Sequence, residues 1–387
     1  MGIKGLMKLL SENADGCYKT TKVKNYMGRI VAIDASMQLY QFMSMVRSQQ
    51  HGGPAQLLAD ENGEVTSHIL GFFHRTIRLM EKGLKPVYVF DGKPPEMKSN
   101  ELKKRKAEKA KAQSELKELE AKLKEGEGGD KTISMINKAQ QRNLSVTKKH
   151  NEDVQKLLKL MGVPVVFAPC EAEAQCAELC KKKKVFATAT EDMDALTFAT
   201  PILLRNLTYS ESRKLDVFEI HYEKILSELK LKPRQFVDLC ILCGCDYSPS
   251  IKGIGPKSAL KLIREHESLE AVLKSLENTK YNVPKELSEN VDEIRRMFED
   301  PEVDDGSKFD KFEWKKPDED SLKQFLVIEK QFAEDRVVNG LKRLEQSKKQ
   351  TSQRRMDSFF KPKDGGGAFK RKKTNNKKQA KGKKLKK

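Results

Sequence analysis

Acidic residues recur in this sequence just after short apolar runs, a pattern that suits divalent-metal chemistry. Four runs of β-branched and aromatic residues, at 29–33, 86–90, 163–167 and 185–189, are each followed within a few positions by Asp or Glu. The acids in question are Asp34, Asp91, Glu171, Glu173, Asp192 and Asp194, and Asp246 lies further along the chain. Hard oxygen ligands of this kind favour Mg²⁺ or Mn²⁺ over Zn²⁺. Two such ions can activate a water and stabilise the leaving oxygen of a phosphodiester.

We therefore predict that the seven carboxylates converge on one pocket. So many like charges would raise one another's pKa values unless bound cations relieved the repulsion. The alternative is that each acid lies at the N-terminus of a helix, where a negative charge is favourable. That alternative explains any one of the acids but explains all seven poorly.

Two basic residues follow Asp91 at a spacing that places them side by side. Lys98 and Arg105 lie seven residues apart, which is two turns of one helix, so they share a face. We predict that they draw a scissile phosphate toward the metal ions. The alternative is that they are ordinary exposed side chains of a Lys-rich helix.

The elements that must position these residues follow from the alternation of apolar runs and helical patterns. This alternation predicts an α/β fold, with a parallel or partly mixed twisted sheet flanked by helices. In such sheets, sites form beyond the carboxyl ends of the strands, which is where the acids lie. Helices are expected over 96–124 and 132–161, as an insertion between two strands, and again over 233–243 and 256–265.

A glycine-rich segment between the last two predicted helices suits a nucleic-acid backbone. Gly253 and Gly255 allow close approach of the main chain to a ligand, and Pro256 is favourable at the first position of a helix. Free N–H groups at that helix start can bind a phosphate, and Lys257 lies beside them. We predict a helix-hairpin-helix motif that grips duplex backbone without reading bases. The alternative is a simple joint between two helices.

The C-terminal region carries a short motif and a basic tail. Gln353, Met356, Phe359 and Phe360 form the pattern Q-x-x-M-x-x-F-F, typical of peptides that bind a sliding clamp. The alternative is that both Phe side chains pack on the body of the protein. Residues 361–387 contain 13 basic residues and one acid, so we expect a disordered tail that suits a polyanion or nuclear import. A merely solubilising tail is the alternative.

The composition excludes several classes of protein. The 387 residues are 37 % hydrophobic and 34 % charged, with a formal net charge of +19. No apolar run reaches the roughly 18 residues that suggest a membrane span. Seven cysteines, an odd number, argue against a secreted disulfide scaffold and for a reducing compartment. Cys240, Cys243 and Cys245 are expected to be buried thiols rather than metal ligands.

Together these motifs resemble those of the flap endonuclease family of 5′ nucleases. The resemblance covers nearly all of residues 1–360. Its matching segments are Met1-Gly2-Ile3-Lys4-Gly5-Leu6, Val31-Ala32-Ile33-Asp34-Ala35-Ser36, Val89-Phe90-Asp91-Gly92-Lys93-Pro94-Pro95, Glu171-Ala172-Glu173-Ala174, Thr190-Glu191-Asp192-Met193-Asp194 and Gly255-Pro256-Lys257.

The resemblance implies a PIN-like fold and a Mg²⁺-dependent, structure-specific DNA endonuclease. The family cleaves 5′ flaps on branched DNA in Okazaki fragment maturation and long-patch base excision repair, and it has 5′-to-3′ exonuclease activity. Two metal ions per chain are implied, with Mn²⁺ able to substitute. The first site matches Asp34, Asp91, Glu171 and Glu173, and the second matches Asp192, Asp194 and Asp246. Lys98 and Arg105 match the catalytic basic pair at the base of a helical arch that admits the 5′ strand.

The resemblance also assigns DNA contacts and partners. The DNA-contacting positions are Arg47, Arg75, Glu171, Gly244 and Asp246, and Tyr40 matches a residue that stacks on a base near the cut. The segment with Gly253, Gly255 and Lys257 resembles a potassium-assisted duplex grip, which implies K⁺ there. The Gln353 motif resembles the peptide that binds the sliding clamp PCNA. Expected partners are branched double-flap DNA and PCNA, with no membrane and a monomer when not on the clamp. Expected locations are the nucleus, both nucleolus and nucleoplasm, and the mitochondrion.

The predicted domain organisation has six parts. They are an N-terminal nuclease region (1–109), a helical arch (110–162), an internal nuclease region with the helix-hairpin-helix (163–266), a C-terminal helical region (267–350), the clamp-binding peptide (351–360) and the basic tail (361–387). The arch is longer than we expect for the family. Two alternative functions stay open: a related 5′-3′ exonuclease or junction-cutting nuclease, and a non-catalytic clamp-associated DNA-binding adaptor.

Overall fold

The structure is a computed structural model. It describes residues 2–45, 47–48, 56–57, 65–124, 129–209, 215–277 and 279–350. Within these residues, no helix has both the length and the apolar character that crossing a membrane requires.

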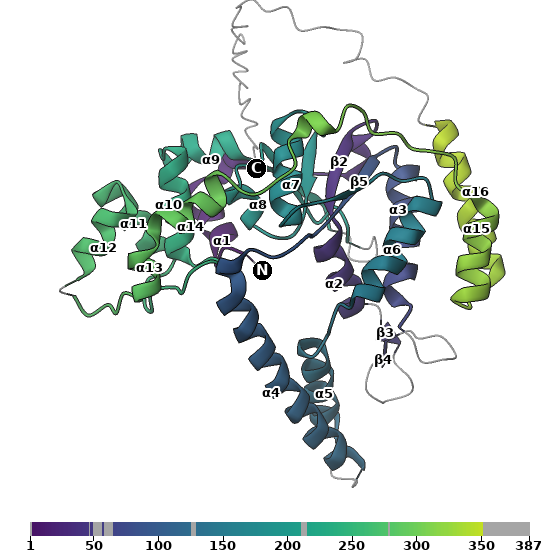
Figure 1. Ribbon diagram of the computed structural model, residues 1–387, viewed down its shortest axis with the longest axis horizontal. Coiled ribbons are helices and arrows are strands. Elements are labelled where there is room, and N and C mark those ends of the chain that lie inside the picture. The colour runs from purple at the N-terminus through teal and green to yellow at the C-terminus, as the bar shows by residue number, and fades with distance from the viewer. Residues whose placement is uncertain are drawn as a thin grey trace, which may run out of the picture. The chain divides into compact units, whose positions relative to one another are not determined.

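Seven strands of the described residues form the central sheet (Figure 1), in the order β1-β9-β8-β7-β2-β5-β6. Their bounds are β1 (Tyr18–Thr21), β2 (Ile30–Asp34), β5 (Lys85–Phe90), β6 (Val165–Phe167), β7 (Ala187–Ala189), β8 (Ile202–Arg205) and β9 (Val217–His221). The five strands from β8 to β6 run parallel, whereas β9 is antiparallel to both of its neighbours. The expected mixed α/β sheet is therefore confirmed. A separate two-stranded ladder joins β3 (Arg47–Ser48) to β4 (Gln56–Leu57).

Helices account for most of the remaining described residues. The longer helices are α1 (Leu6–Asn13), α2 (Ala35–Met45), α3 (Ser67–Glu81), α4 (Ser99–Lys124), α5 (Asp130–Arg142), α6 (Lys148–Leu160), α7 (Ala172–Lys181), α9 (Tyr222–Leu229), α10 (Pro233–Cys243), α11 (Pro256–His266), α12 (Leu269–Leu276), α14 (Val291–Glu299) and α16 (Glu334–Gln350). The shorter ones are α8 (Asp194–Thr197), α13 (Lys285–Glu289), α15 (Glu319–Lys323), the 3₁₀ turns η1 (Asp15–Cys17), η2 (Val23–Tyr26), η3 (Glu96–Lys98) and η5 (Gly306–Lys308), and the π-helical η6 (Gln324–Glu329).

Both faces of the sheet are covered, because alternate residues of each strand point to opposite sides. On β2, Val31 and Ile33 pack into one apolar cluster with side chains of α2, α3, α6 and α16. Ala32, between them, packs into another cluster with α7, where Cys176 and Leu179 lie. The apolar strand runs that the sequence shows are thus explained by burial on two sides.

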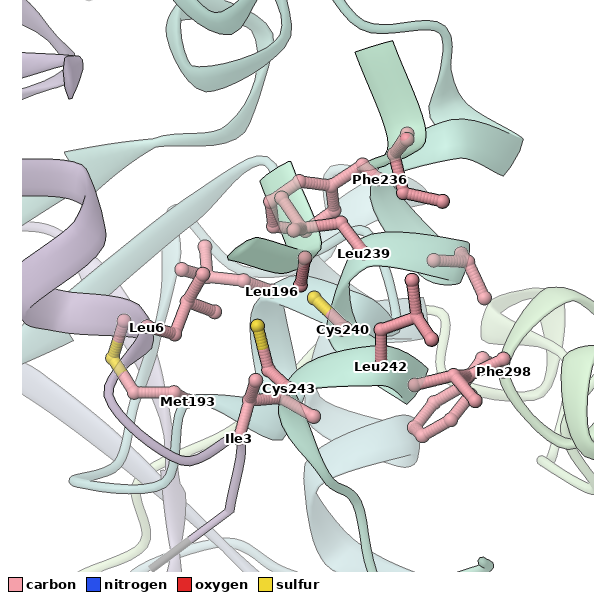
Figure 2. Close-up of a cluster of buried hydrophobic side chains, with 14 of the residues drawn as sticks. Ile3, Leu6, Met193, Leu196, Phe236, Leu239, Cys240, Leu242, Cys243 and Phe298 are labelled. Carbon is pink, nitrogen blue, oxygen red and sulfur yellow. The ribbon is translucent and has the colours of Figure 1, made fainter. Parts of the chain in front are cut away.

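A third apolar cluster joins the N-terminus to the helices after the sheet. Figure 2 shows Ile3 and Leu6 close to Met193 and Leu196, with side chains of α10 such as Cys243 beside them. The cluster includes Met193, the N-cap of α8, and Cys243, the last residue of α10. It therefore fixes the positions of the polar residues that follow these two elements.

The predicted helical insertion is a hairpin of α4 and α5, which projects from the body (Figure 1). The hairpin has a small core of Leu119, Ile136 and Ala139. The helix expected over 132–161 is instead two helices, because Thr147 caps a new one: its hydroxyl accepts a hydrogen bond from the His150 amide. That second helix, α6, is buried against the sheet. The domain boundaries themselves stay predictions.

Candidate active site

The ends of parallel strands bring the first acids together. In the register of β2 and β5, Asp34 lies beside Val89, so Asp34 and Asp91 leave the sheet at the same edge. The Asp91 carboxylate accepts a hydrogen bond of 2.9 Å from the Ala172 amide, at the start of α7. Because α7 begins there, Glu171 at its N-cap and Glu173 in its first turn are brought to the same edge.

The other acids reach this edge from β7 and α10. Asp192 follows β7, and its carboxylate accepts a hydrogen bond of 3.1 Å from the amide of Asp194, the first residue of α8. Asp246 follows α10, whose helix bounds are those that the sequence predicts. A cleft of 1130 Å³ is lined by Asp91, Glu171, Glu173, Asp192 and Asp246, while Asp34 and Asp194 are buried. The structure thus brings all seven predicted acids to one region.

Two basic side chains lie among these acids. The Lys98 ammonium forms ion pairs with Glu171 and, at 3.2 Å, with Asp246. The Arg105 guanidinium donates to both oxygens of Asp246 at 2.8 Å. The two residues are not on one helix as predicted, because Lys98 ends the 3₁₀ turn η3 and Arg105 lies in α4. Both side chains nevertheless lie beside the acids. Within the described part of the chain, no group of three His, Cys, Asp or Glu side chains is arranged to hold a metal ion.

Several carboxyl groups at the cleft have pKa values raised above their ordinary values. Burial, followed by the charge of Asp91, raises the pKa of the Asp34 carboxyl from 3.8 to about 7. Burial and the charge of Asp34 raise the pKa of Glu173 well above its ordinary value. Burial and the neighbouring Asp192 do the same to the pKa of Asp194. Burial, and after it the repulsion between neighbouring acids, therefore disfavours the ionised form of these three carboxyl groups.

A bound divalent cation would stabilise the ionised form of these carboxyl groups. The Oδ1 atom of Asp194 is buried and accepts no hydrogen bond from any described residue. A buried oxygen without a partner costs free energy unless something else satisfies it. The donor set is made of carboxylate oxygens, the ligands that Mg²⁺ and Mn²⁺ prefer. The chemistry of these residues therefore fits the metal sites that the sequence suggests.

The predicted DNA contacts near the cleft are placed unequally. Tyr40, on α2, lines the cleft and is 37 % exposed, so its ring is available for stacking. Arg75, on α3, is half-buried, and its guanidinium donates to the Tyr209 carbonyl. Arg47 lies in β3, but its side chain is outside the described residues.

The glycine-rich segment lies between two helices as predicted. Gly253 has φ of +90°, which favours glycine. Gly255 is the N-cap of α11, and apart from its chain neighbours no described residue comes within 4 Å of the place of a Cβ there. Lys257 is exposed and pairs with Glu12 at 3.0 Å. Gly244 ends α10 with φ of +105°, and its carbonyl accepts a hydrogen bond of 3.4 Å from the Lys4 amide. The backbone before α11 is therefore open to a ligand.

Sequence reasoning missed two residues of the cleft. The Tyr247 hydroxyl donates to Glu171, although Tyr247 belongs to the segment after α10. Gly2 has φ of +73°, and a Cβ there would lie 1.7 Å from an oxygen of Asp192, so only glycine fits. Tyr247 directly follows Asp246, and that adjacency is the one signal in the sequence that could have drawn attention to it.

The clamp-binding residues Gln353, Met356, Phe359 and Phe360 lie outside the described residues, as does the tail over 361–387. Their roles stay predictions.

Family models match most of the described chain. The XPG N-terminal domain matches residues 1–112, and the XPG I-region matches residues 162–246. The model of the 5′-3′ exonuclease C-terminal SAM fold matches residues 231–318, which contain the glycine-rich segment. The matched regions include all seven acids and both basic residues of the cleft.

Two solved structures share the fold. Flap endonuclease-1 from Methanococcus jannaschii superposes with a TM-score of 0.63 at 30 % identity, over 87 % of this chain and 97 % of that chain. The catalytic core of Rad2, solved in complex with a DNA substrate, superposes with a TM-score of 0.66 at 26 % identity, over 89 % of this chain and 100 % of that chain.

Similarity at the level of sequence is higher. Flap endonuclease 1 of Xiphophorus maculatus is 51 % identical over 361 residues, which cover 93 % of this chain and 90 % of the relative. Flap endonuclease 1 of Drosophila grimshawi is 50 % identical over 390 residues, which cover 100 % of this chain and 96 % of the relative. With this identity over most of both chains, the protein belongs to the flap endonuclease family of nucleases.

Proposed function

We propose that this protein is a Mg²⁺-dependent nuclease that cuts 5′ flaps on branched double-flap DNA and also removes nucleotides from 5′ ends. The observation that carries the proposal is the cleft lined by Asp91, Glu171, Glu173, Asp192 and Asp246, in which Lys98 and Arg105 form ion pairs with two of these acids. The biological setting proposed is Okazaki fragment maturation and long-patch base excision repair, in the nucleus and in a mitochondrial pool.

The acids of the cleft are proposed to hold two metal ions, with Mn²⁺ able to replace Mg²⁺. Asp34, Asp91, Glu171 and Glu173 would hold one ion, and Asp192, Asp194 and Asp246 the other. When bound, such ions activate a water and stabilise the charge that develops on the leaving oxygen. Water then replaces the 3′ oxygen on phosphorus, so the 5′ end of the product keeps its phosphate.

Lys98 and Arg105 are proposed to bind the scissile phosphate. Both side chains form ion pairs with Asp246. Burial alone would lower the pKa of Lys98, but Glu171 and the neighbouring acids raise it by more, so the side chain stays charged. A phosphate that enters the cleft would compete with these carboxylates for the two cations. Charge-assisted hydrogen bonds from lysine and arginine to phosphate oxygens would then hold the substrate in line for attack.

Other parts of the molecule are proposed to place the DNA. The hairpin of α4 and α5 would admit the 5′ strand, and Tyr40 would stack on a base near the cut. The segment with Gly253 and Gly255, assisted by K⁺, would hold the duplex through its phosphates.

The proposal is tested by cutting of labelled substrates. Flap, nicked, bubble and four-way-junction DNA should be compared with Mg²⁺, and Asp192→Ala should be run beside the wild type. We expect preferential cutting of the flap and loss of cutting in the variant. Preferential cutting of a nick or junction would identify a related exonuclease or resolving activity, and binding without any product would identify an adaptor.

The clamp peptide has its own test. Replacement of Phe359 and Phe360 by Ala together should abolish stimulation of cutting by PCNA, because the two rings would supply the buried part of that interface. Cutting without PCNA should stay nearly unchanged. Equal loss of both activities would show that the Phe pair is structural.

A further inference from the structure

Two donors from different parts of the chain hold the two oxygens of Glu171 separately. The Lys98 ammonium pairs with Oε1, and the Tyr247 hydroxyl donates to Oε2. Glu171 and Tyr247 are both buried, at 8 % and 7 % exposure. The carboxylate is thus fixed from both sides.

The two donors differ in how firmly the fold holds them. Tyr247 packs its ring on Phe298 of α14, with ring centroids 4.8 Å apart. Lys98 lies at the base of the α4–α5 hairpin and shares its ammonium between Glu171 and Asp246. A lysine side chain can turn to a phosphate, whereas a packed tyrosine ring stays in place.

The Tyr247 hydroxyl is buried and needs a hydrogen-bond acceptor at its present place, because an unpaired buried hydroxyl costs free energy. The Glu171 oxygen is that acceptor.

We propose that Tyr247 is a positioning residue that holds Oε2 of Glu171 and thereby presents Oε1 to a divalent ion when Lys98 turns to the scissile phosphate. This inference rests on the proposed metal role of Glu171. Hydrogen-bond partners of metal ligands orient them, and their loss typically lowers metal affinity or activity by about 10–100-fold. Tyr247 would thus link the segment that leads to the duplex grip with the metal-binding edge of the sheet.

The test is Tyr247→Phe, which keeps the ring on Phe298 and removes only the hydroxyl. The Mg²⁺ concentration for half-maximal flap cutting should rise about tenfold. The Kd for Mg²⁺, measured by calorimetry on the protein without DNA, should rise in parallel. The Kd for flap DNA in a chelator should stay within about twofold of that of the wild type, because Tyr247 is not proposed to touch DNA.

Tyr26→Phe is the matched control. The Tyr26 hydroxyl donates to a buried Glu219 oxygen at 2.7 Å, so the control loses the same kind of bond away from the cleft. It should lower stability by a similar amount and leave both Mg²⁺ measurements unchanged.

Two results would overturn the inference: wild-type Mg²⁺ values in Tyr247→Phe, or an equal shift in Tyr26→Phe. Failure of the proposed metal dependence would look different, because the wild type itself would then cut DNA in a chelator.

Discussion

Two clusters of buried charge in this protein are built in opposite ways. In the helical region after the sheet, Arg295 is 1 % exposed and donates to both oxygens of Asp238, at 2.5 and 2.9 Å. It also bonds both oxygens of Glu270. At the cleft, Lys98 and Arg105 pair with Glu171 and Asp246, whereas one buried oxygen of Asp194 accepts no hydrogen bond from the described residues.

A carboxyl group of each cluster has its pKa shifted in an opposite direction, and the two groups differ in burial. Hydrogen bonds from Arg295 lower the pKa of Glu270 to about 2. In the cleft, burial and neighbouring acids raise the pKa of Asp34 to about 7. In the Arg295 cluster, the guanidinium donates hydrogen bonds to both oxygens of Asp238 and of Glu270, whereas a buried oxygen of Asp194 has no such donor. This difference supports the proposal that the acids of the cleft bind cations.

Asp194→Asn is expected to have the largest effect, because it should change flap cutting and the free energy of unfolding in opposite directions. Flap cutting should fall by about a thousandfold or more, because a proposed metal ligand loses its charge. The free energy of unfolding of the metal-free protein should instead rise by about 0.5–2 kcal/mol, since a buried repulsion is removed. Single-turnover kinetics and urea denaturation measure the two quantities. A variant that is both inactive and less stable would place Asp194 with the structural cluster.

Arg295→Met should show the reverse pattern. Removal of the guanidinium leaves Asp238 as a buried charge without its partner, so unfolding should become easier by about 3–5 kcal/mol. Urea denaturation gives this value. Below the unfolding transition, the rate of cutting per folded molecule should stay within about threefold of the wild-type rate. A large loss of rate in the folded variant would show that the two clusters are coupled.

A change of pH should act on the cleft and leave the Arg295 cluster unaffected. The folded pKa of Asp34 lies near 7, above its ordinary 3.8, so the folded state binds the proton more tightly and stability falls as pH rises through this window. Without metal, Asp34 alone should therefore stabilise the protein by about 2 kcal/mol when the pH is lowered from 7 to 5. Asp34→Asn should remove this part of the slope, while Glu173 and Asp194, whose pKa values are also raised, should keep the rest.

Glu270 provides the contrast, because its pKa is lowered rather than raised. Its contribution is present above its ordinary 4.5 and is lost only as pH falls toward about 2. Between pH 7 and 5, Glu270→Gln should therefore keep the wild-type slope. Thermal unfolding of both variants in a chelator measures this difference. A flat wild-type profile would contradict the raised pKa of Asp34.

Much of the fold and of the cleft follows from local sequence. The four apolar runs become β2, β5, β6 and β7 because strands buried on both faces need continuous apolar residues. The helix over Pro233–Cys243 is recognisable from its proline at the first position and its glycine after the end. Six of the seven acids follow strands, so the parallel topology predicts that those six meet, whereas Asp246 follows the helix α10.

What could not be predicted depends on contacts between distant residues. Arg295 and Asp238 are 57 residues apart, and Tyr247 and Glu171 are 76 residues apart. No spacing or periodicity indicates such pairs. The strands β1, β8 and β9 were not predicted, because none of them contains more than three consecutive apolar residues. The break between α5 and α6 depends on one capping threonine.

The smallest effect is expected from an exposed ion pair. It tests whether the contribution of an ion pair to the free energy of unfolding depends on its burial. Arg234 forms an ion pair with Asp292 at 3.3 Å, but the two side chains are 60 % and 77 % exposed. Water screens such a pair, so Arg234→Ala should change the free energy of unfolding by less than about 0.5 kcal/mol. Asp292 also contacts Arg295, so the two substitutions act on one chain of charges at different depths. Urea denaturation of both variants under the same conditions gives the comparison. If Arg234→Ala lowered the free energy of unfolding as much as Arg295→Met, burial could not explain why the Arg295 cluster stabilises the fold.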